Sequence, residues 1–107
     1  MLKHVARTLK SCVRAEDMVC RYGGEEMTII LNNADRNTGV GIAQKICKTI
    51  ADKDYELTPD LEVKITISLG VSTYPENGTT PTELIEYADK CLYKAKENGR
   101  NQVGFLE

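Results

Sequence analysis

The residues best suited to chemistry lie in one short segment, residues 21–27, which reads RYGGEEM. Two consecutive glycines, Gly23 and Gly24, remove side chains from a turn, so a ligand can approach the backbone N–H groups closely. Two carboxylates, Glu25 and Glu26, follow directly. At the mouth of a turn both can converge on one hard cation such as Mg²⁺. The alternative is a solvated hairpin tip with incidental acids, which these common turn signals favour when taken alone.

Two further pairs of charged residues could bind a phosphate or a base. Lys96 and Arg100 are four residues apart, which places both on one helix face if the expected helix extends that far. They could hold a triphosphate, but complementing the helix dipole is the commoner role. Arg14 and Asp17 offer a guanidinium beside a carboxylate. Arg can bind phosphate or a guanine edge bidentately and Asp can accept from guanine N–H groups, with a surface ion pair as the default.

Composition limits the classes of protein to which the chain can belong. Its 107 residues suffice for one small domain and not for two. The net charge of −2 argues against a general nucleic-acid binder, so we expect no nucleic-acid polymer as a partner. No apolar run approaches the length of a membrane span, so we expect no direct membrane contact. The four cysteines form no C-x-x-C pair, and we interpret them as reduced thiols in a cytoplasmic protein.

Hydrophobic periodicity predicts the elements that must position these residues. We expect a helix over 2–13, a second helix capped by Asp35, and a third that starts at the capping box of residues 80–83 and ends before Gly99. A hairpin is predicted over 18–31. The clearest strand covers 61–67 and continues past Gly70, which marks a bulge or a close backbone approach, and a short strand ends the chain. This order predicts an α+β sandwich with helices over a mostly antiparallel sheet.

Four segments together resemble the GGDEF domain of diguanylate cyclases, in that family's order and spacing. They read RAED at 14–17, RYGGEEM at 21–27, ISLGVS at 67–72 and ADKCLYKAKENGRN at 88–101. Each motif alone is weak, but the set is specific and outweighs the ordinary alternatives above. Met27 replaces the usual Phe of the signature and can fill the same apolar slot. Glu25 replaces its Asp, a variant that is compatible with active members.

The resemblance implies a ferredoxin-like, nucleotidyl-cyclase-like fold and the condensation of two GTP molecules into cyclic di-GMP with release of two pyrophosphates. Two domains would face each other as a homodimer, each holding one GTP. Gly23 and Gly24 would lie against the phosphates. Glu25 would bind Mg²⁺ (or Mn²⁺) and help to activate the 3′-hydroxyl, with Glu26 assisting at the metal.

The resemblance also assigns the remaining charged pairs. Lys96 and Arg100 would grip the terminal phosphates of GTP. Arg14 and Asp17 match the R-x-x-D inhibitory site, at which cyclic di-GMP binds and restrains the enzyme. An upstream sensory or receiver domain, and a membrane tether of the parent protein, are further features that the family allows.

Family members begin with a strand that carries a metal-binding aspartate, followed by an asparagine and an aspartate that read guanine. We expect residues 1–107 to form the C-terminal portion of a single GGDEF domain, without that first strand and part of the first helix. Sheet edges or apolar helix faces should then be unpaired, the chain alone should be inactive, and it could associate by strand exchange. The alternatives are a cyclic di-GMP receptor without turnover, a structural dimerisation element, and a synthase of a mixed guanine–adenine dinucleotide.

Overall fold

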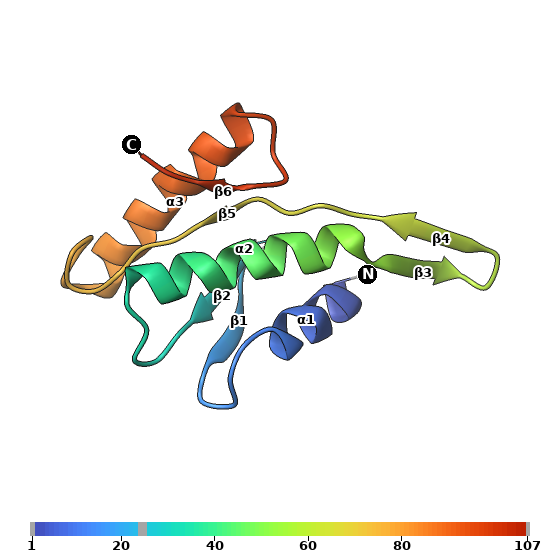
Figure 1. The fold of residues 1–107 in the computed structure, drawn as a ribbon, viewed down its shortest axis with the longest axis horizontal. Helices are drawn as coiled ribbons and strands as arrows, with labels where there is room; N and C mark the ends of the chain where they lie inside the picture. Colours follow the sequence, from blue (N-terminus) through green and yellow to red (C-terminus); the bar gives the residue numbers. More distant parts are fainter. Residues whose placement is uncertain (1, 24–25, 107) are drawn as a thin grey trace.

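The computed structural model describes residues 2–23 and 26–106, with the side chains of 3–20 and 26–106. Within these ranges the chain forms three helices and three two-stranded ribbons, so the expected α+β class is confirmed (Figure 1). The elements in chain order are α1 (Leu2–Ser11), β1 (Met18–Gly23), β2 (Glu26–Ile30), α2 (Arg36–Asp52), β3 (Asp54–Thr58), β4 (Leu61–Lys64), β5 (Leu69–Gly70), α3 (Pro81–Glu97) and β6 (Val103–Gly104). No helix in these ranges is long and apolar enough to cross a membrane.

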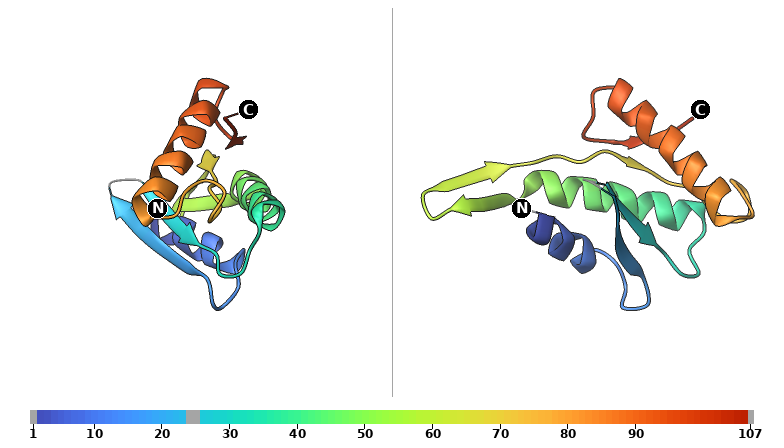
Figure 2. Two further views of the ribbon diagram at one scale, coloured as in Figure 1. Left: turned by 90° about the vertical axis from the view of Figure 1, so that its left-hand side faces the viewer. Right: turned by 180° about the vertical axis from the view of Figure 1, so that it is seen from behind.

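The α2 helix runs through the middle of the molecule and separates two layers. In Figure 1, α1 and the β1–β2 ribbon lie on one side of α2, and α3 with the β5–β6 ribbon lies on the other. The views in Figure 2 show the same arrangement from two further directions. The antiparallel β1–β2 ribbon confirms the predicted hairpin, with Met18 opposite Ile30 and Gly23 opposite Glu26.

Both long helices begin at the predicted caps. The Asp35 carboxylate accepts a hydrogen bond from Thr38 N at 2.8 Å, and Thr80 Oγ1 accepts one from Glu83 N at 3.2 Å. The return bond of the expected capping box is displaced by one residue, because Glu83 Oε1 accepts from Thr79 N at 3.0 Å. These N–H donors lower the pKa of both carboxyl groups, since each stabilises the charged form.

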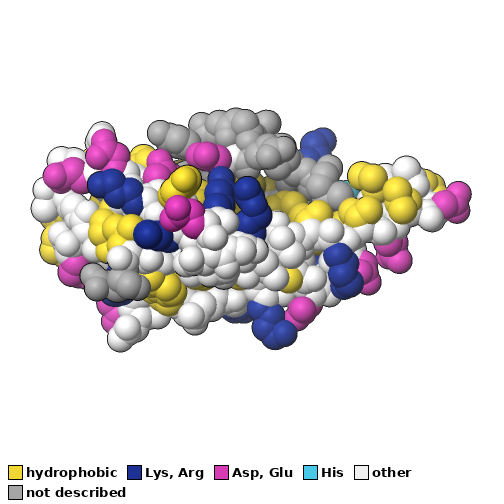
Figure 3. All heavy atoms as spheres, turned by 90° about the horizontal axis from the view of Figure 1, so that it is seen from above, with side chains coloured by type: hydrophobic (Ala, Val, Ile, Leu, Met, Phe, Trp, Pro, Cys, Tyr) yellow, Lys and Arg dark blue, Asp and Glu magenta, His cyan; other side chains and the backbone are white. Residues whose placement is uncertain are grey.

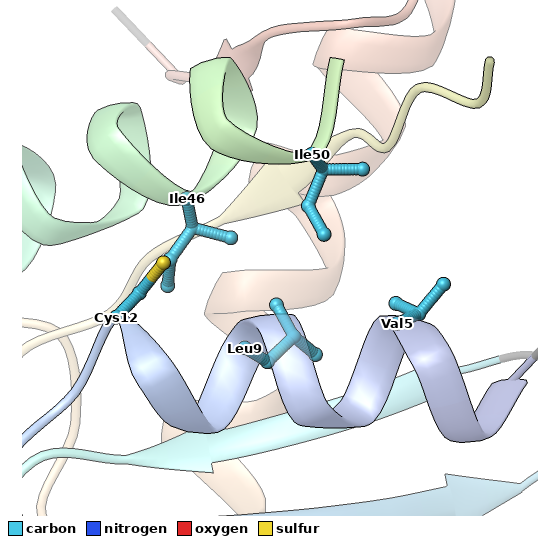
Figure 4. Close-up of a cluster of buried hydrophobic side chains, with 5 residues drawn as sticks. All are labelled: Val5, Leu9, Cys12, Ile46 and Ile50. Atoms are coloured by element: carbon cyan, nitrogen blue, oxygen red, sulfur yellow. The ribbon is translucent and has the colours of Figure 1, made fainter. Parts of the chain in front are cut away.

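The central core is made by α1 against α2. Its buried members are Val5, Leu9 and Cys12 of α1, and Ile46 and Ile50 of α2, and their side chains point toward one another (Figure 4). The Ile50 side chain is fully buried. Burial of a side chain of this size stabilises the folded state by roughly 1.5 to 3 kcal/mol. This contact fixes the position of α1, and therefore of the turn that follows it.

The α3 helix packs directly on the parallel β5–β6 ribbon, in which Gly70 pairs with Gly104. A Cβ on Gly70 would lie 2.0 Å from Ala88 O of α3, so the expected close backbone approach at this glycine is confirmed. Gly104 approaches the same helix in the same way. On α3, the small side chains of Cys91 and Ala95 are buried and allow this contact.

The predicted strand over 61–67 is too long, because β4 ends at Lys64. Its partner is β3, which the sequence analysis did not predict, and the β3–β4 hairpin extends beyond the helices (Figures 1 and 2). Leu57 and Leu61 are therefore 53% and 47% exposed, and hydrophobic atoms are visible at this end of the molecule in Figure 3. The apolar face, which we expected to be buried, is exposed to solvent at the tip because none of the described elements covers it.

The other departures concern the sheet and the ends of two elements. The expected mostly antiparallel sheet is present as three separate ribbons within the described residues, two antiparallel and one parallel. The predicted final strand is limited to Val103 and Gly104, and α1 ends at Ser11 rather than at Val13. Alternating hydrophobicity indicates an extended backbone, but hydrogen-bonded pairing also requires a neighbouring strand, which the segment 65–68 lacks among the described residues.

Candidate functional site

The two described ends of the glycine-glutamate motif, Gly23 and Glu26, are the last residue of β1 and the first residue of β2. The backbone of Gly23 pairs with Glu26 after a shift in register between Arg21 and Gly23. Gly24 and Glu25 lie outside the described residues, and the predictions for them stay predictions. Glu26 is exposed, whereas Met27 is partly buried against the α1–α2 core cluster, which agrees with its expected apolar slot. Adjacent strand residues point to opposite faces, so the Glu26 carboxylate points toward solvent when Met27 points toward the core.

Lys96 and Arg100 do not share a helix face, because α3 ends at Glu97. Gly99 has φ +111°, and Arg100 N donates to Ala95 O at 2.8 Å. This is a Schellman turn, and it confirms Gly99 as the residue that follows the helix cap. Arg100 itself has φ +64°, so the chain has already turned away from the helix axis there.

Both of these cations are nevertheless exposed. Gln102 Nε2 donates to Asn98 O and to Arg100 O, each at 3.0 Å, and so stabilises the turn that carries Arg100. Among the described side chains, neither Lys96 nor Arg100 has an ion-pair partner. The arrangement leaves two cationic groups at one helix end available to an anion.

Arg14 and Asp17 form the most completely connected part of the candidate site. Asp17 Oδ2 accepts from Arg14 N at 2.9 Å and from Arg14 Nε at 3.2 Å. Asp17 Oδ1 accepts from Asn32 N at 2.9 Å and from Arg14 Nη2 at 3.3 Å. These four bonds occupy the acceptor positions of the carboxylate. The Asp17 side chain is fully buried, whereas 42% of the Arg14 side chain is exposed.

The charges of this pair are mutually stabilised. The backbone N–H of Asn32 is the largest cause that lowers the pKa of Asp17, and hydrogen bonds from Arg14 lower it further. The hydrogen bond to Asp17 raises the pKa of Arg14. Asp17 is therefore ionised and Arg14 cationic at neutral pH. The sequence analysis foresaw a surface ion pair as the ordinary alternative, but the carboxylate lies in the interior.

Asn32 is a member of this site that the sequence analysis missed. Its backbone oxygen accepts from Arg14 Nη2, and its side-chain Nδ2 donates to Glu16 O. It follows β2, while Arg14 and Asp17 precede β1, and the β1–β2 pairing brings the two segments together. The sequence marks Asn32 and Asn33 only as a break in the apolar pattern. Asn33 has φ +54°, a backbone conformation that asparagine adopts more readily than most residues.

The described residues hold no ready-made metal cluster, and two of the cysteines are unreactive thiols. Within these ranges, no group of three or more His, Cys, Asp or Glu side chains could hold a metal ion. The four cysteines are free, in agreement with their interpretation as thiols. Burial raises the pKa of Cys47 and of Cys91, which keeps both protonated and unreactive.

Comparison with known proteins places these motifs in a family. The sequence profile described as diguanylate cyclase, GGDEF domain, matches residues 1–102. Diguanylate cyclase A of Treponema denticola is 39% identical over 103 residues, which cover 96% of this chain and 28% of that protein. The chain thus spans less than a third of that relative's length.

Two solved structures share the fold. An EAL/GGDEF domain protein from M. capsulatus matches with a TM-score of 0.88 and 34% identity, over 99% of this chain and 68% of that one. The active GGEEF domain of a diguanylate cyclase from Vibrio cholerae matches with a TM-score of 0.87 and 27% identity, over 99% and 66% of the two chains. The expected nucleotidyl-cyclase-like fold is thereby confirmed. The motifs, the profile match and the shared fold together show that this chain belongs to the GGDEF domain family of diguanylate cyclases.

Proposed function

We propose that this chain belongs to the catalytic domain of a diguanylate cyclase, which condenses two GTP molecules into one cyclic di-GMP and releases two pyrophosphates. The observation that carries the proposal is the hairpin tip, where Gly23 pairs with Glu26 on a fold shared with a GGEEF domain described as active. Because the family shares this motif and fold, GTP is the substrate that best fits the site.

In this proposal the glycines of the motif bind the phosphates and the glutamates bind the metal ion. Gly23 and Gly24 present backbone N–H groups to the nucleotide phosphates, because no side chain obstructs the approach. Glu25 and Glu26 supply carboxylate oxygens, the ligands that Mg²⁺ or Mn²⁺ prefers, and the outward position of Glu26 supports this assignment. A metal bound there neutralises the triphosphate and lowers the pKa of the attacking 3′-hydroxyl.

Lys96 and Arg100 bind the terminal phosphates in this proposal. Their exposure and the absence of an acidic partner among the described side chains support it. Cyclisation requires two nucleotides to attack each other, so the active form is a homodimer with one GTP in each chain. In this proposal the parent protein is cytoplasmic, and an upstream sensory or receiver domain controls the pairing of the two chains.

Arg14 and Asp17 form a product site in the same proposal. Arg14 is the exposed member, and its guanidinium can bind phosphate or the guanine edge of cyclic di-GMP. Asp17 holds Arg14 in place and is buried. Since Asp17 already accepts four hydrogen bonds, a ligand that bonds to it must displace one of the internal donors.

A cyclic di-GMP receptor without turnover is the second candidate function. It is favoured by one observation, which is that the Arg14 site is assembled from residues of this chain alone. Such a receptor needs neither the metal nor a second GTP. The two functions therefore differ in whether GTP is consumed.

A combined assay tests both functions. The chain is joined to the first strand of a GGDEF domain, which the sequence analysis expects turnover to require, and is incubated with GTP and Mg²⁺. The products are separated by chromatography, and cyclic di-GMP binding is measured by calorimetry. Formation of cyclic di-GMP that is lost in Glu25→Gln and kept in Glu62→Gln, an exposed glutamate of β4, supports the cyclase. Binding of cyclic di-GMP without GTP consumption supports the receptor. Failure to bind GTP and cyclic di-GMP alike would contradict both functions.

A further inference from the structure

Asn32 lies outside every motif that identifies the family, yet it makes hydrogen bonds to three of the four residues of the R-x-x-D turn, Arg14, Glu16 and Asp17. We propose that Asn32 is a positioning residue, which fixes the plane of the Arg14 guanidinium for binding of the product. The proposal rests on the proposed product site, because that site supplies the ligand. It adds a residue from a distant part of the chain to a site otherwise contained within residues 14–17.

The contacts of Asn32 reach the turn at three different points. Its backbone oxygen accepts from Arg14 Nη2. Its backbone N–H donates to Asp17 Oδ1 at 2.9 Å. Its side-chain amide donates to the carbonyl of Glu16. The bond to Nη2 restrains the Arg14 guanidinium directly. The bond to Oδ1 restrains the Asp17 carboxylate, which in turn binds the guanidinium. The bond to Glu16 O restrains the backbone between Arg14 and Asp17.

These bonds determine which edge of Arg14 faces outward. An arginine has five N–H donors in one plane. Nε and Nη2 are engaged by Asp17 and by the Asn32 carbonyl, so this edge faces the protein. Nη1 has no hydrogen-bond partner among the described residues, and the side chain is 42% exposed. The two N–H groups of Nη1 are thus presented in a fixed plane to an incoming phosphate or guanine.

The side chain of Asn32 contributes to positioning Arg14 because the two backbone contacts of Asn32 form only if its backbone is held in place. Asn32 is beyond the end of β2, where ladder hydrogen bonds no longer restrain the chain. The following residue, Asn33, turns with φ +54°. The amide bond to Glu16 O ties this free segment to the turn across 16 residues of sequence. Without it, Arg14 must be immobilised at the moment of binding, which costs roughly two- to tenfold in affinity.

The test compares Asn32→Ala with a matched control, Asn37→Ala. Asn37 is an exposed asparagine in the first turn of α2 and makes no side-chain hydrogen bond within the described part of the chain. Cyclic di-GMP is titrated by calorimetry, and the Arg14 Nε–Hε signal is followed by NMR. We expect Asn32→Ala to weaken binding about two- to tenfold and to shift the Arg14 signal. We expect Asn37→Ala to change neither.

A second variant covers the case in which Asn32→Ala fails to fold. Asn32→Asp keeps the size of the side chain but has no N–H donor for the Glu16 carbonyl, and it should also shift the Arg14 signal. Unfolding temperatures are measured for every variant, since a purely structural role would lower stability and leave the Arg14 signal of the folded protein unchanged. That unchanged signal would overturn the proposal.

The outcomes separate this proposal from the one on which it rests. A wild-type chain that binds no cyclic di-GMP contradicts the product site, and the Arg14 signal then decides the positioning role by itself. A wild-type chain that binds, with Asn32→Ala binding equally well, overturns the positioning role and leaves the product site intact. If the wild type binds cyclic di-GMP, Arg14→Ala should abolish this binding because it removes the guanidinium.

Discussion

Gly70 and Gly104 are paired across the parallel β5–β6 ribbon, and both face the backbone of α3. A Cβ on Gly70 would lie 2.0 Å from Ala88 O, and one on Gly104 would lie 1.8 Å from Cys91 O. Real Cβ atoms do not approach carbonyl oxygens so closely, and backbone atoms cannot rotate away as a side chain can. The ribbon and the helix therefore pack at a distance that only glycine permits at both positions.

Gly104→Ala should consequently destabilise the fold strongly. We expect a loss of about 3 kcal/mol in the free energy of unfolding, because the extra methyl group forces α3 away from β6. Urea unfolding followed by circular dichroism measures the loss. Gly41→Ala is the matched control, since a Cβ on this exposed glycine of α2 meets nothing within 4 Å. The control should gain about 0.5 to 1 kcal/mol from helix propensity.

The α1–α2 core predicts a second difference in stability. Ile50 is 0% exposed, and Ile50→Ala should cost about 2 to 5 kcal/mol because it leaves a cavity between the helices. Ile30, at the end of β2, is 49% exposed, and Ile30→Ala should cost much less. Equilibrium unfolding of both variants tests this. Equal losses would contradict the position of the core.

Asp17 predicts a dependence of stability on pH. Its pKa lies below the ordinary value of 3.8, chiefly because of the Asn32 N–H, so the unfolded chain binds the proton more tightly. The stabilisation is complete above pH 3.8 and is lost as the pH falls from there through the lower native pKa. Asp17→Asn lacks this contribution. The stability of the wild type should therefore approach that of Asp17→Asn as the pH falls, in acid titrations monitored by urea unfolding.

That convergence has a clear counter-result. If the difference in stability between wild type and Asp17→Asn stayed constant from neutral pH to below pH 3.8, then Asp17 would not be the ionised, hydrogen-bonded group described here. Asp52 offers a comparison, because its pKa is lowered mainly by Lys48 on the helix surface. Asp52→Asn should change stability little at any pH, since an exposed ion pair contributes little.

Arg14→Lys tests the fork-like geometry of the product site. Arginine binds Asp17 and the Asn32 carbonyl through Nε and Nη2 and leaves Nη1 for a ligand. Lysine keeps the positive charge but has a single nitrogen, so it cannot make all of these contacts. We expect cyclic di-GMP affinity to fall at least about tenfold, toward that of Arg14→Ala. Arg7→Lys, on the exposed side of α1, is the control and should bind like the wild type. Calorimetric affinities near wild type for Arg14→Lys would show that charge alone suffices.

The sequence by itself predicted the features that depend on neighbouring residues. The caps Asp35 and Thr80 were predicted because each side chain reaches the N–H three residues later. The hairpin over 18–31 was predicted because two glycines accept the turn. Gly99 was recognised as a stop signal for α3 for the same local reason. The family also followed from the sequence, since four short motifs in a set order are a one-dimensional signal.

Some local signals were present but incomplete. Residues 54–58 alternate polar and apolar side chains and precede Pro59 and Asp60, which is a hairpin signal that would have predicted β3. The same alternation over 61–67 predicted too long a strand. Alternation records which side chains prefer water, but not whether a second strand lies within hydrogen-bonding distance.

Only the tertiary structure decided the features that join distant residues. It showed that Asp17 is buried rather than part of a surface pair, because the β1–β2 pairing carries the Asn32 N–H to it from 15 residues away. It showed Gly104 against α3, which no local pattern marks. It also showed that Arg100 leaves the helix that carries Lys96. Contacts of this kind depend on which surfaces pack together, and packing is a property of the whole fold rather than of any segment.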